Sequence, residues 1–366
     1  MDSPPSSTRV VVIGAGQAGL SVAYYLQRLG LEPAADFVVL DRGPATGGAW
    51  QHRWDALTLG SAHRVADLPG MAELDLSFET ADRTRPAREV VAEYYARYEE
   101  HYGLRVARPV RVTRVADADL ALSVSYATPD AVGDIRTDTL VNATGTWGAP
   151  FVPHYPGAEA FAGEHVHTAT YRGAEQYRGK RVVVVGGGTS AIGFLLELEG
   201  VAAELTWASR RPIDFVDGDG LSMSAAVNAV TEQDVAARAG AALPSIVSGT
   251  GVPRTRRVAA GIDRGVLVAR PMFERILPHG IRWADGTEQE ADVILWATGF
   301  RPELRHLAAL KLREKEGGIA VGNGASWTDP RVFFAGYGPQ ASTIGANRAG
   351  RAIARQVVAM LSSIGL

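Results

Sequence analysis

Residues 10–19 read VVVIGAGQAG, a run of β-branched residues that ends in glycines spaced Gly-x-Gly-x-x-Gly. The apolar run predicts a buried parallel strand, and the apolar spacing of residues 17–29 predicts a helix directly after it. Gly14 allows the tight turn, Gly16 lets the backbone approach a pyrophosphate, and Gly19 permits close packing of helix on strand. The stretch therefore predicts a Rossmann-type dinucleotide-binding unit, in which the helix N-terminus faces the phosphates.

The next apolar run, residues 37–40, ends on Asp41. A carboxylate at the end of this second strand accepts hydrogen bonds from the hydroxyls of an adenosine ribose. Two glycines follow in the stretch GGAW, residues 47–50, and indicate a loop that passes close to a cofactor. Trp50 and Trp54 are open to two interpretations, as walls of the cofactor pocket or as core aromatics.

A second fingerprint, GGGTSA at residues 186–191, lies between another apolar run and another stretch with helical spacing. The strand predicted after it, residues 203–208, ends in Ser209-Arg210-Arg211 instead of an acid. An acid would favour the free ribose of NADH, whereas guanidinium groups bind the extra phosphate of NADPH in a bidentate fork. We therefore expect NADPH at the second site.

Two fingerprints predict two bound dinucleotides, normally FAD and NAD(P)H, and hence electron transfer from a nicotinamide to a flavin. The chain has no cysteine, which excludes a redox-active dithiol, a thiolate metal site and an iron–sulfur cluster; we expect no metal. A net charge of -3 and the lack of an apolar run of about 20 residues give no reason to expect nucleic acid or a membrane as partner. The N-terminal residues lack the layout of a signal peptide, so we expect a cytoplasmic protein.

A more specific string lies between the two fingerprints. Residues 161–171 read FAGEHVHTATY and match F-x-G-x-x-x-H-x-x-x-Y, the signature of the flavin-containing monooxygenases. The stretches NATG (142–145), ATGF (297–300) and FAGYG (334–338) also follow the order found in that family. The chain thus resembles the flavin-containing monooxygenases over nearly its full length, and least over residues 213–280.

The resemblance implies a flavin-dependent monooxygenase. In that family NADPH reduces the FAD, the reduced flavin adds O2 at C4a, and the resulting (hydro)peroxyflavin oxygenates a soft nucleophile, usually nitrogen or sulfur. Baeyer–Villiger enzymes resemble the family but carry Trp at the last signature position, where this chain has Tyr171. This favours nitrogen or sulfur of a small organic substrate over a ketone. The resemblance also implies that His167 couples two domains and does not act as a general base.

Three alternatives stay open: Baeyer–Villiger-type ketone oxygenation, an NAD(P)H oxidase or reductase without oxygen insertion, and a redox-sensing flavoprotein that binds both cofactors without turnover. One departure from the family bears on them. Where the relatives read Leu-x-Leu-Asn-x-Pro, with the Asn side chain directed at the flavin, residues 57–63 read LTLGSAH. Gly60 replaces the amide, and Ser61 and His63 are the candidate substitutes. Without a substitute, we expect the enzyme to release hydrogen peroxide.

The sequence predicts an α/β fold with two Rossmann-like domains. The FAD-binding domain is expected at residues 1–172 and 293–366, and the inserted NADPH-binding domain at 173–292, with a lid or substrate-side insertion at 213–261. The expected partners are a small-molecule substrate and O2, and a homodimer is left open. The expected catalytic residues are His167, Gly60, Ser61 and His63. The expected cofactor-binding residues are Gly14, Gly16, Gly19, Asp41, Gly47, Gly48, Trp50, Thr144, Gly145, Gly186, Gly188, Thr189, Ser190, Arg210, Arg211, Thr298, Gly299, Gly336 and Thr343.

Overall fold

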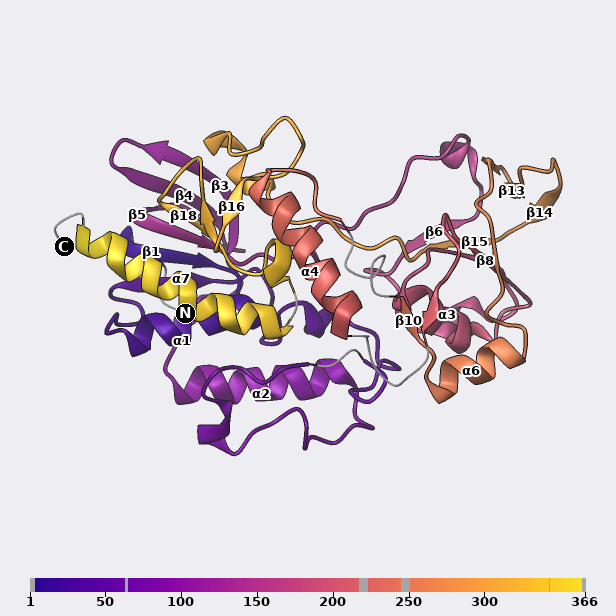
Figure 1. Ribbon diagram of the computed structural model, residues 1–366, viewed down its shortest axis with the longest axis horizontal. Coiled ribbons are helices and arrows are strands. Elements are labelled where there is room, and N and C mark those ends of the chain that lie inside the picture. The colour runs from indigo at the N-terminus through magenta and orange to yellow at the C-terminus, as the bar shows by residue number, and fades with distance from the viewer. Residues whose placement is uncertain (1–3, 63–64, 217–222, 245–250, 342, 364–366) are drawn as a thin grey trace. The chain divides into compact units, whose positions relative to one another are not determined.

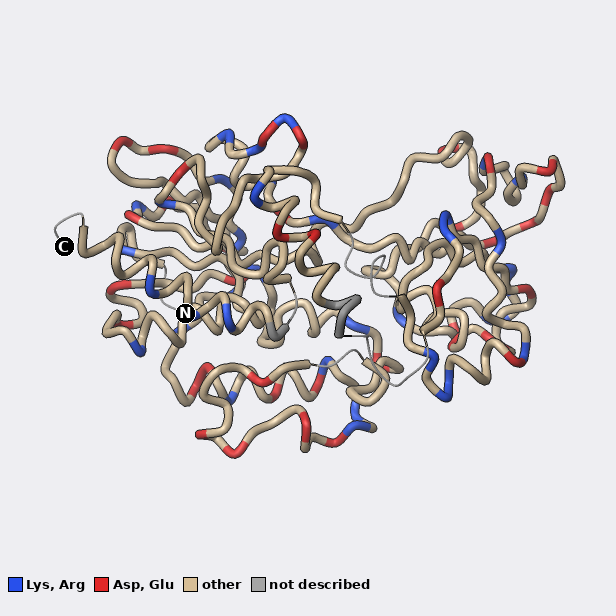
Figure 2. The backbone as a smooth tube through the Cα atoms, in the orientation of Figure 1, with Lys and Arg blue, Asp and Glu red and all other residues tan. Residues whose placement is uncertain are grey.

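The chain forms two compact units in the computed structural model, which describes residues 4–62, 65–216, 223–244, 251–341 and 343–363 (Figure 1). The first unit holds Met1–Gly148, Thr231–Leu243 and Pro302–Leu366, and the second holds Ala149–Val230 and Pro244–Arg301. The second unit is therefore inserted into the chain of the first. Figure 2 shows acidic and basic residues interspersed along the backbone. In the described part of the chain, no helix is long and apolar enough to cross a membrane.

The first unit is built on an eight-stranded sheet whose centre is parallel. β1 (Ser7–Ile13) pairs in parallel with β2 (Phe37–Leu40) on one side and with β5 (Val132–Asn142) on the other. β18 (Val332–Phe334) continues the parallel order beyond β5. The strand order is β16-β17-β18-β5-β1-β2, and β4 pairs with both β5 and β3. The other strands of this sheet are β3 (Arg111–Ala118), β4 (Ala121–Ala127), β16 (Val321–Gly322) and β17 (Ala325–Ser326).

Both faces of this central sheet are buried. Val10 and Val12 pack into one core with residues of α1 (Gln17–Arg28), α2 (Ala87–His101) and α7 (Thr343–Ser363). Val11 and Ile13 pack on the opposite face, into a core shared with β3, β4 and the segment that follows Pro302. Burial on both faces explains why the central strands are apolar without alternation. Figure 1 shows α1 and α7 side by side along the sheet.

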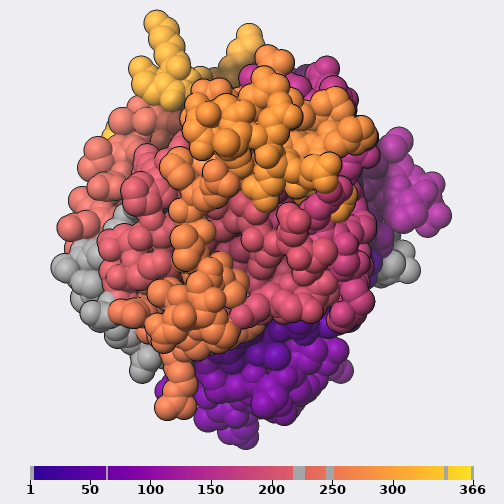
Figure 3. All heavy atoms as spheres, turned by 90° about the vertical axis from the view of Figure 1, so that its right-hand side faces the viewer, coloured from indigo at the N-terminus to yellow at the C-terminus, as the bar shows by residue number. Residues whose placement is uncertain are grey.

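The second unit contains an all-parallel five-stranded sheet in the order β11-β8-β7-β15-β6. Its helix α3 (Thr189–Leu198) connects β7 to β8, as in a Rossmann-type unit. Figure 3 views the face formed mostly by this unit, coloured magenta to orange. The strands of its main sheet are β6 (Glu164–His167), β7 (Arg181–Val185), β8 (Glu204–Ala208), β11 (Ala269–Arg270) and β15 (Val293–Trp296). The other elements are β9 (Phe215–Val216), β10 (Val252–Pro253), α6 (Arg256–Asp263), β12 (Arg275–Leu277), β13 (Gly280–Arg282) and β14 (Glu288–Glu290). The helix α4 (Met223–Arg238) begins in this unit, and its residues from Thr231 onwards belong to the first unit.

The observed units differ from the expected domain bounds in two respects. First, β6 and β15 pair with each other, and β15 also pairs with β7, so the inserted unit extends to Ala149 and Arg301. Its two ends are adjacent, because the Arg301 N–H donates to the Ala149 carbonyl at 2.8 Å. Second, residues 231–243, expected in the insertion, cluster with the first unit. The Ala242 N–H donates to the Glu316 carbonyl at 3.1 Å, which holds that segment there.

The elements predicted around the fingerprints are confirmed. α1 begins at Gln17 and α3 at Thr189, each directly after its glycine turn. β3, β4 and β5 form an antiparallel meander. Tyr95 and Tyr98 of α2 are core residues.

Candidate functional site

The first fingerprint forms a turn between β1 and α1 that has no room for side chains. Gly14 has a φ of +104°, and a Cβ there would lie 2.5 Å from the carbonyl oxygen of Ala143. A Cβ on Gly19 would lie 1.8 Å from the carbonyl oxygen of Gly14. Glycine is therefore needed at the first position for the turn and at the last for the packing of α1.

A second glycine loop comes into contact with this turn. Gly48 has a φ of +53°, and a Cβ there would lie 2.7 Å from the Cα of Gly16. Gly16 is also the N-cap of α1 and makes no side-chain hydrogen bond to it. The first N–H groups of a helix have no partner within the helix and attract anions. The backbones of Gly16 and Gly48 carry no side chains and lie beside a helix N-terminus. This arrangement fits a dinucleotide pyrophosphate.

Asp41 joins the turn after β1 to the loop after β2. Its Oδ2 accepts the Ala15 N–H and its Oδ1 accepts the Gly43 N–H, both at 2.7 Å. The Nε of Arg108 lies 3.8 Å from Oδ1, while the rest of that guanidinium is bonded to Glu99 at 2.6 and 2.7 Å. Each carboxylate oxygen has a further lone pair, so Asp41 retains acceptor capacity for ribose hydroxyls. The structure adds a role in fixing the turn that the sequence did not indicate.

Aromatic and basic side chains gather after the GGAW stretch. Trp50 and Trp54 are both buried, which is compatible with either interpretation, a core aromatic or a pocket wall. The guanidinium carbon of Arg53 lies 4.4 Å from the ring centroid of Trp147 and 5.7 Å from that of Trp50. The imidazole of His52 is stacked on Trp147 with centroids 5.9 Å apart. A cluster of aromatic and cationic side chains therefore follows the short 3-10 helix Gly48–His52, which begins at the contact between Gly48 and Gly16.

The NATG stretch after β5 is fixed by polar contacts. The Nε2 of His306 donates to the Oδ1 of Asn142 at 2.7 Å, and the Thr144 hydroxyl donates to the carbonyl of Glu303 at 2.8 Å. Burial lowers the pKa of His306 to about 4, so the imidazole is neutral at pH 7. Gly145 takes a φ of +61°. The predicted residues Thr144 and Gly145 thus lie in a constrained turn at the carboxyl edge of the parallel strands.

The second fingerprint repeats the turn in the second unit. Gly186 has a φ of +139°, and a Cβ there would lie 2.3 Å from the carbonyl oxygen of Ala297. The indole Nε1 of Trp207 donates to the carbonyl oxygen of Gly186 at 2.6 Å. Gly188 is the N-cap of α3 and makes no side-chain hydrogen bond. Thr189 begins the helix, so its first N–H groups fit a second pyrophosphate.

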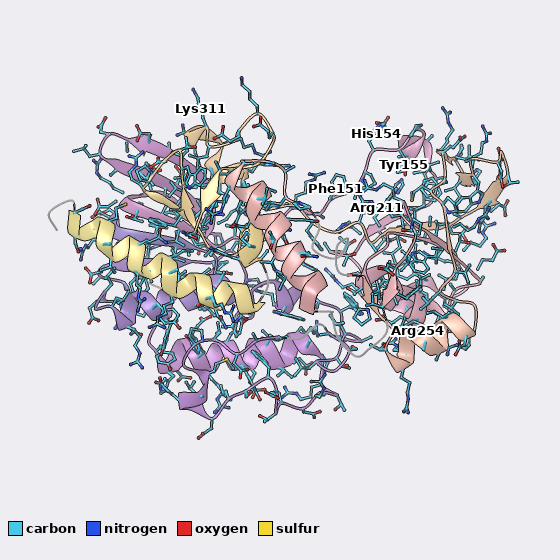
Figure 4. All side chains as sticks on the ribbon, in the orientation of Figure 1. Phe151, His154, Tyr155, Arg211, Arg254 and Lys311 are labelled. Atoms are coloured by element: carbon cyan, nitrogen blue, oxygen red, sulfur yellow. The ribbon has the colours of Figure 1, made fainter. Side chains whose placement is uncertain are left out.

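The predicted phosphate-binding arginines follow β8. Arg210 and Arg211 are exposed, and within the residues the structure describes neither has an ion-pair partner. The buried Ser209 donates its hydroxyl to the carbonyl of Arg211 at 2.8 Å. Burial raises the pKa of Tyr155, and the positive charge of Arg210 opposes this shift. Figure 4 labels Arg211 and Tyr155 in this unit. Two guanidinium groups without a described carboxylate partner therefore follow β8, the strand after the second fingerprint.

Both ring nitrogens of His167 are engaged within the second unit. Nε2 donates to the Gly299 carbonyl and Nδ1 accepts the Ala169 N–H, each at 3.1 Å. The ring packs edge-on against Phe300, with centroids 5.0 Å apart. Burial lowers the pKa of His167, so the ring is neutral at pH 7. The imidazole joins the signature string to the ATGF stretch, and this geometry does not suit a general base.

Tyr171, the last signature residue, is fully buried. Its hydroxyl donates to Glu197 at 3.1 Å, and its ring lies 5.7 Å from that of Tyr177 and 4.3 Å from that of Phe194. Burial raises the pKa of its phenol. The side chain packs β6 and its following turn against α3. Any influence of Tyr171 on substrate choice is therefore indirect.

The loop expected to approach the flavin edge gives Gly60 a packing role. The Gly60 N–H donates to the Arg83 carbonyl at 2.8 Å, and a Cβ on Gly60 would lie 2.9 Å from the same oxygen. Ser61 is exposed and its hydroxyl lies 3.1 Å from both the carbonyl oxygen and the Oγ1 of Thr58. His63 lies outside the described residues. The close approach of the Arg83 carbonyl thus explains why position 60 is a glycine.

The remaining predicted residues lie in loops at the ends of strands and helices. The Thr298 hydroxyl donates to the Phe151 carbonyl in the second unit. Gly336 has a φ of +74°, and a Cβ there would lie 3.2 Å from the Cβ of Ala18 in α1. Thr343 begins α7. The first unit gathers Gly14, Gly16, Gly19, Asp41, Gly47, Gly48, Trp50, Thr144, Gly145, Gly336 and Thr343, and the second gathers His167, Gly186, Gly188, Thr189, Ser190, Arg210, Arg211, Thr298 and Gly299.

Three side chains of the first site were not singled out from the sequence. Gln17, inside the fingerprint, accepts from the Tyr95 hydroxyl at 2.5 Å and donates to Asn347 of α7 at 2.9 Å. His306 holds the NATG stretch, and Arg53 lies between two indole rings. Gln17 and Arg53 lie close in sequence to the glycine motifs, and this proximity could have marked them as candidate site residues. His306 has no local signal, because its partner lies 164 positions away.

Comparison with known proteins identifies relatives over nearly the whole chain. Residues 11–244 match the family described as "Pyridine nucleotide-disulphide oxidoreductase". The solved structure of a flavin-containing monooxygenase from Stenotrophomonas maltophilia is 34% identical, covers 98% of this chain and 100% of its own, and superimposes with a TM-score of 0.79. An indole-3-pyruvate monooxygenase, YUCCA1 of Oryza sativa subsp. japonica, is 28% identical over 82% of this chain and 80% of its own. A senecionine N-oxygenase of Tyria jacobaeae is 28% identical over 55% of this chain and 46% of its own.

Proposed function

Because the chain belongs to the flavin-containing monooxygenases and is a flavin-dependent monooxygenase, we propose that it uses FAD and NADPH to oxygenate nitrogen or sulfur of a small organic molecule. NADPH supplies two electrons, O2 supplies one oxygen atom to the substrate, and the other leaves as water. The observation that supports this assignment of cofactors is an asymmetry. Both glycine turns precede a helix N-terminus, but only the second is followed by two arginines, Arg210 and Arg211.

The first unit is proposed to hold FAD. Gly16 and Gly48 leave bare backbone beside the N-terminus of α1, and a side chain on Gly48 would fill the space between them. Asp41 lies at the end of β2 with acceptor capacity for a ribose. When bound, the flavin supplies the redox and oxygen chemistry. The residues of this unit bind and orient it.

The second unit is proposed to hold NADPH. Gly186 makes the turn, and the N-terminus of α3 faces the pyrophosphate. Arg210 and Arg211 then provide the fork for the 2′-phosphate, since the structure gives their charges no carboxylate among the described residues. NADH lacks that phosphate and would leave both guanidinium groups without a ligand.

Nitrogen or sulfur is proposed as the acceptor because such a lone pair reacts without prior removal of a proton. This agrees with His167, whose two ring nitrogens are both occupied by backbone groups. The senecionine N-oxygenase among the relatives supports the same class of acceptor. Nothing in the geometry of the described residues favours ketone oxygenation. Tyr171 also stands at the position where Baeyer–Villiger enzymes carry Trp.

The test is product analysis with a panel of tertiary amines, thioethers and cyclic ketones under 18O2. We expect N-oxides or S-oxides that carry one labelled oxygen, formed only in the presence of NADPH. Esters or lactones from the ketones, without any N- or S-oxide, would overturn the choice of acceptor. NADPH oxidation that yields hydrogen peroxide alone across the panel would favour an oxidase instead.

A further inference from the structure

Among the described residues of the first unit, Arg53 is a half-buried cation without a carboxylate partner. Its Nε is buried and has no hydrogen-bond partner, and no described carboxylate lies within ion-pair distance of its guanidinium. Burial lowers the pKa of Arg53 to about 10, and no nearby charge contributes to that shift. The side chain is therefore still charged at neutral pH. It lies over the indole of Trp147 at 4.4 Å and beside that of Trp50 at 5.7 Å.

Two other arginines of the first unit do have carboxylate partners. Arg88 contacts Asp55 at 2.6 Å. Arg108 contacts Glu99 at 2.6 Å. Asp55 is only two positions from Arg53 in the sequence, yet its carboxylate is engaged by a different cation. The region thus contains acidic residues, but the fold directs none of the described ones to Arg53.

A charge that is partly removed from water, with a buried Nε that has no hydrogen-bond partner among the described residues, is unfavourable. The two indole rings offset part of this penalty, because a guanidinium within about 6 Å of an aromatic centroid is attracted to the ring. An anionic ligand would offset more of it. The planar fork of a guanidinium matches a carboxylate, and two indoles beside it favour a planar or apolar body attached to that carboxylate.

The position of Arg53 separates it from the pyrophosphate turn. Gly48 contacts Gly16 at the start of a five-residue 3-10 helix, and Arg53 follows the end of that helix. At a rise of about 2 Å per residue, this places Arg53 roughly 10 Å further along. The backbone N–H groups of the turn and of α1 already provide for the cofactor phosphates. The anion that suits Arg53 is therefore a different group.

We infer that Arg53, between Trp50 and Trp147, is a binding subsite for the carboxylate of an aromatic or apolar acid, and that the substrate of this enzyme belongs to that class. This inference rests on the proposed function, since it specifies the molecule to be oxygenated. The subsite binds the carboxylate and orients the remainder of the molecule. It takes no part in electron or oxygen transfer.

The experiment uses two probes of nearly equal shape, phenylacetate and its neutral amide phenylacetamide. Their affinities for the FAD-loaded protein are measured by isothermal titration calorimetry without NADPH, so the result does not depend on turnover. Wild type should bind phenylacetate at least about tenfold more tightly than the amide, which is the range of a charge-assisted hydrogen bond. Arg53→Met should abolish that preference, and Arg53→Lys should retain part of it, which also shows that the site tolerates substitution.

Two further measurements show whether the anion bound by Arg53 is a substrate carboxylate or a group of the cofactor. Arg88→Met removes a neighbouring arginine that has a carboxylate partner and should leave the preference for phenylacetate unchanged. FAD affinity, measured by titration of apoprotein, should change less than about threefold in Arg53→Met. A loss of FAD affinity greater than tenfold with no preference for phenylacetate in wild type would assign the anion to the cofactor and overturn the inference. Equal binding of both probes to wild type, or a preference that survives in Arg53→Met, would overturn it as well.

Discussion

The close approach of Gly48 to Gly16 predicts a specific loss of FAD affinity when Gly48 is replaced by alanine. An alanine at a φ of +53° takes a left-handed backbone that costs about 1–2 kcal/mol. Its Cβ would also lie 2.7 Å from the Cα of Gly16, so one of the two backbones has to move by several tenths of an ångström. That movement displaces the N–H groups proposed to bind the pyrophosphate. Losing one charge-assisted hydrogen bond of about 1.5–3 kcal/mol raises the Kd for FAD at least about tenfold.

Gly103 provides the matched control within the same unit. It has a φ of +58°, and a Cβ there would meet nothing within 4 Å. Gly103→Ala therefore carries the same backbone penalty without the collision. As an apoprotein, Gly103→Ala should lose about 1–2 kcal/mol of unfolding free energy and Gly48→Ala at least as much, but only Gly48→Ala should bind FAD more weakly in a flavin-fluorescence titration. Equal FAD affinities in the two variants would refute the assignment of this contact to the cofactor.

The remaining predictions concern the second cofactor, acid stability and coupling. Replacing Arg210 and Arg211 by Ala should raise the KM for NADPH roughly tenfold or more and leave that for NADH nearly unchanged; equal increases for both in steady-state assays would mean that the arginines are structural. Burial lowers the pKa of His306 to about 4 from 6.5, so its contribution to stability is present above pH 6.5 and is lost as the pH falls towards 4. His306→Gln should therefore remove about 3 kcal/mol of the acid-induced loss seen in urea unfolding, and an unchanged pH dependence would contradict this. With NADPH and no substrate, wild type should release hydrogen peroxide because Gly60 lacks an amide; tight coupling in a peroxide assay would contradict that reading.

Local patterns predicted the two nucleotide turns well. The run before each turn is apolar because its strand is buried, and the glycines are fixed by contacts a few residues away, such as that of Gly19 with Gly14. These are short-range requirements, so they appear as short-range motifs. The placement of β6 and β15 in the sheet of the second unit was not predictable in the same way. Each has four residues, and the choice of partner strand depends on tertiary contacts that leave no periodic signal.

Other features depended on neighbours that the sequence does not reveal. Gly60 is a glycine because the Arg83 carbonyl approaches it, whereas the motif comparison pointed only to a missing amide. Arg53 was not singled out from the sequence, and the structure places it beside two indoles and beside no described carboxylate. Residues 231–243 joined the first unit through backbone hydrogen bonds to residues 316–318. Such pairings are made across long stretches of chain, where composition and spacing carry little information.

The adjacent ends of the inserted unit have a consequence for the order of folding. Closing an unstructured loop of roughly 150 residues costs about 4 kcal/mol in chain entropy. Once the second unit is folded, its hydrogen bond between Arg301 and Ala149 has already closed that loop. The Glu303 N–H can then reach the Gly145 carbonyl, 3.0 Å away in the finished structure, and β18 can find β5 without a long search. We therefore expect the inserted unit to fold early and to template the last parallel pairing of the sheet that surrounds it in sequence.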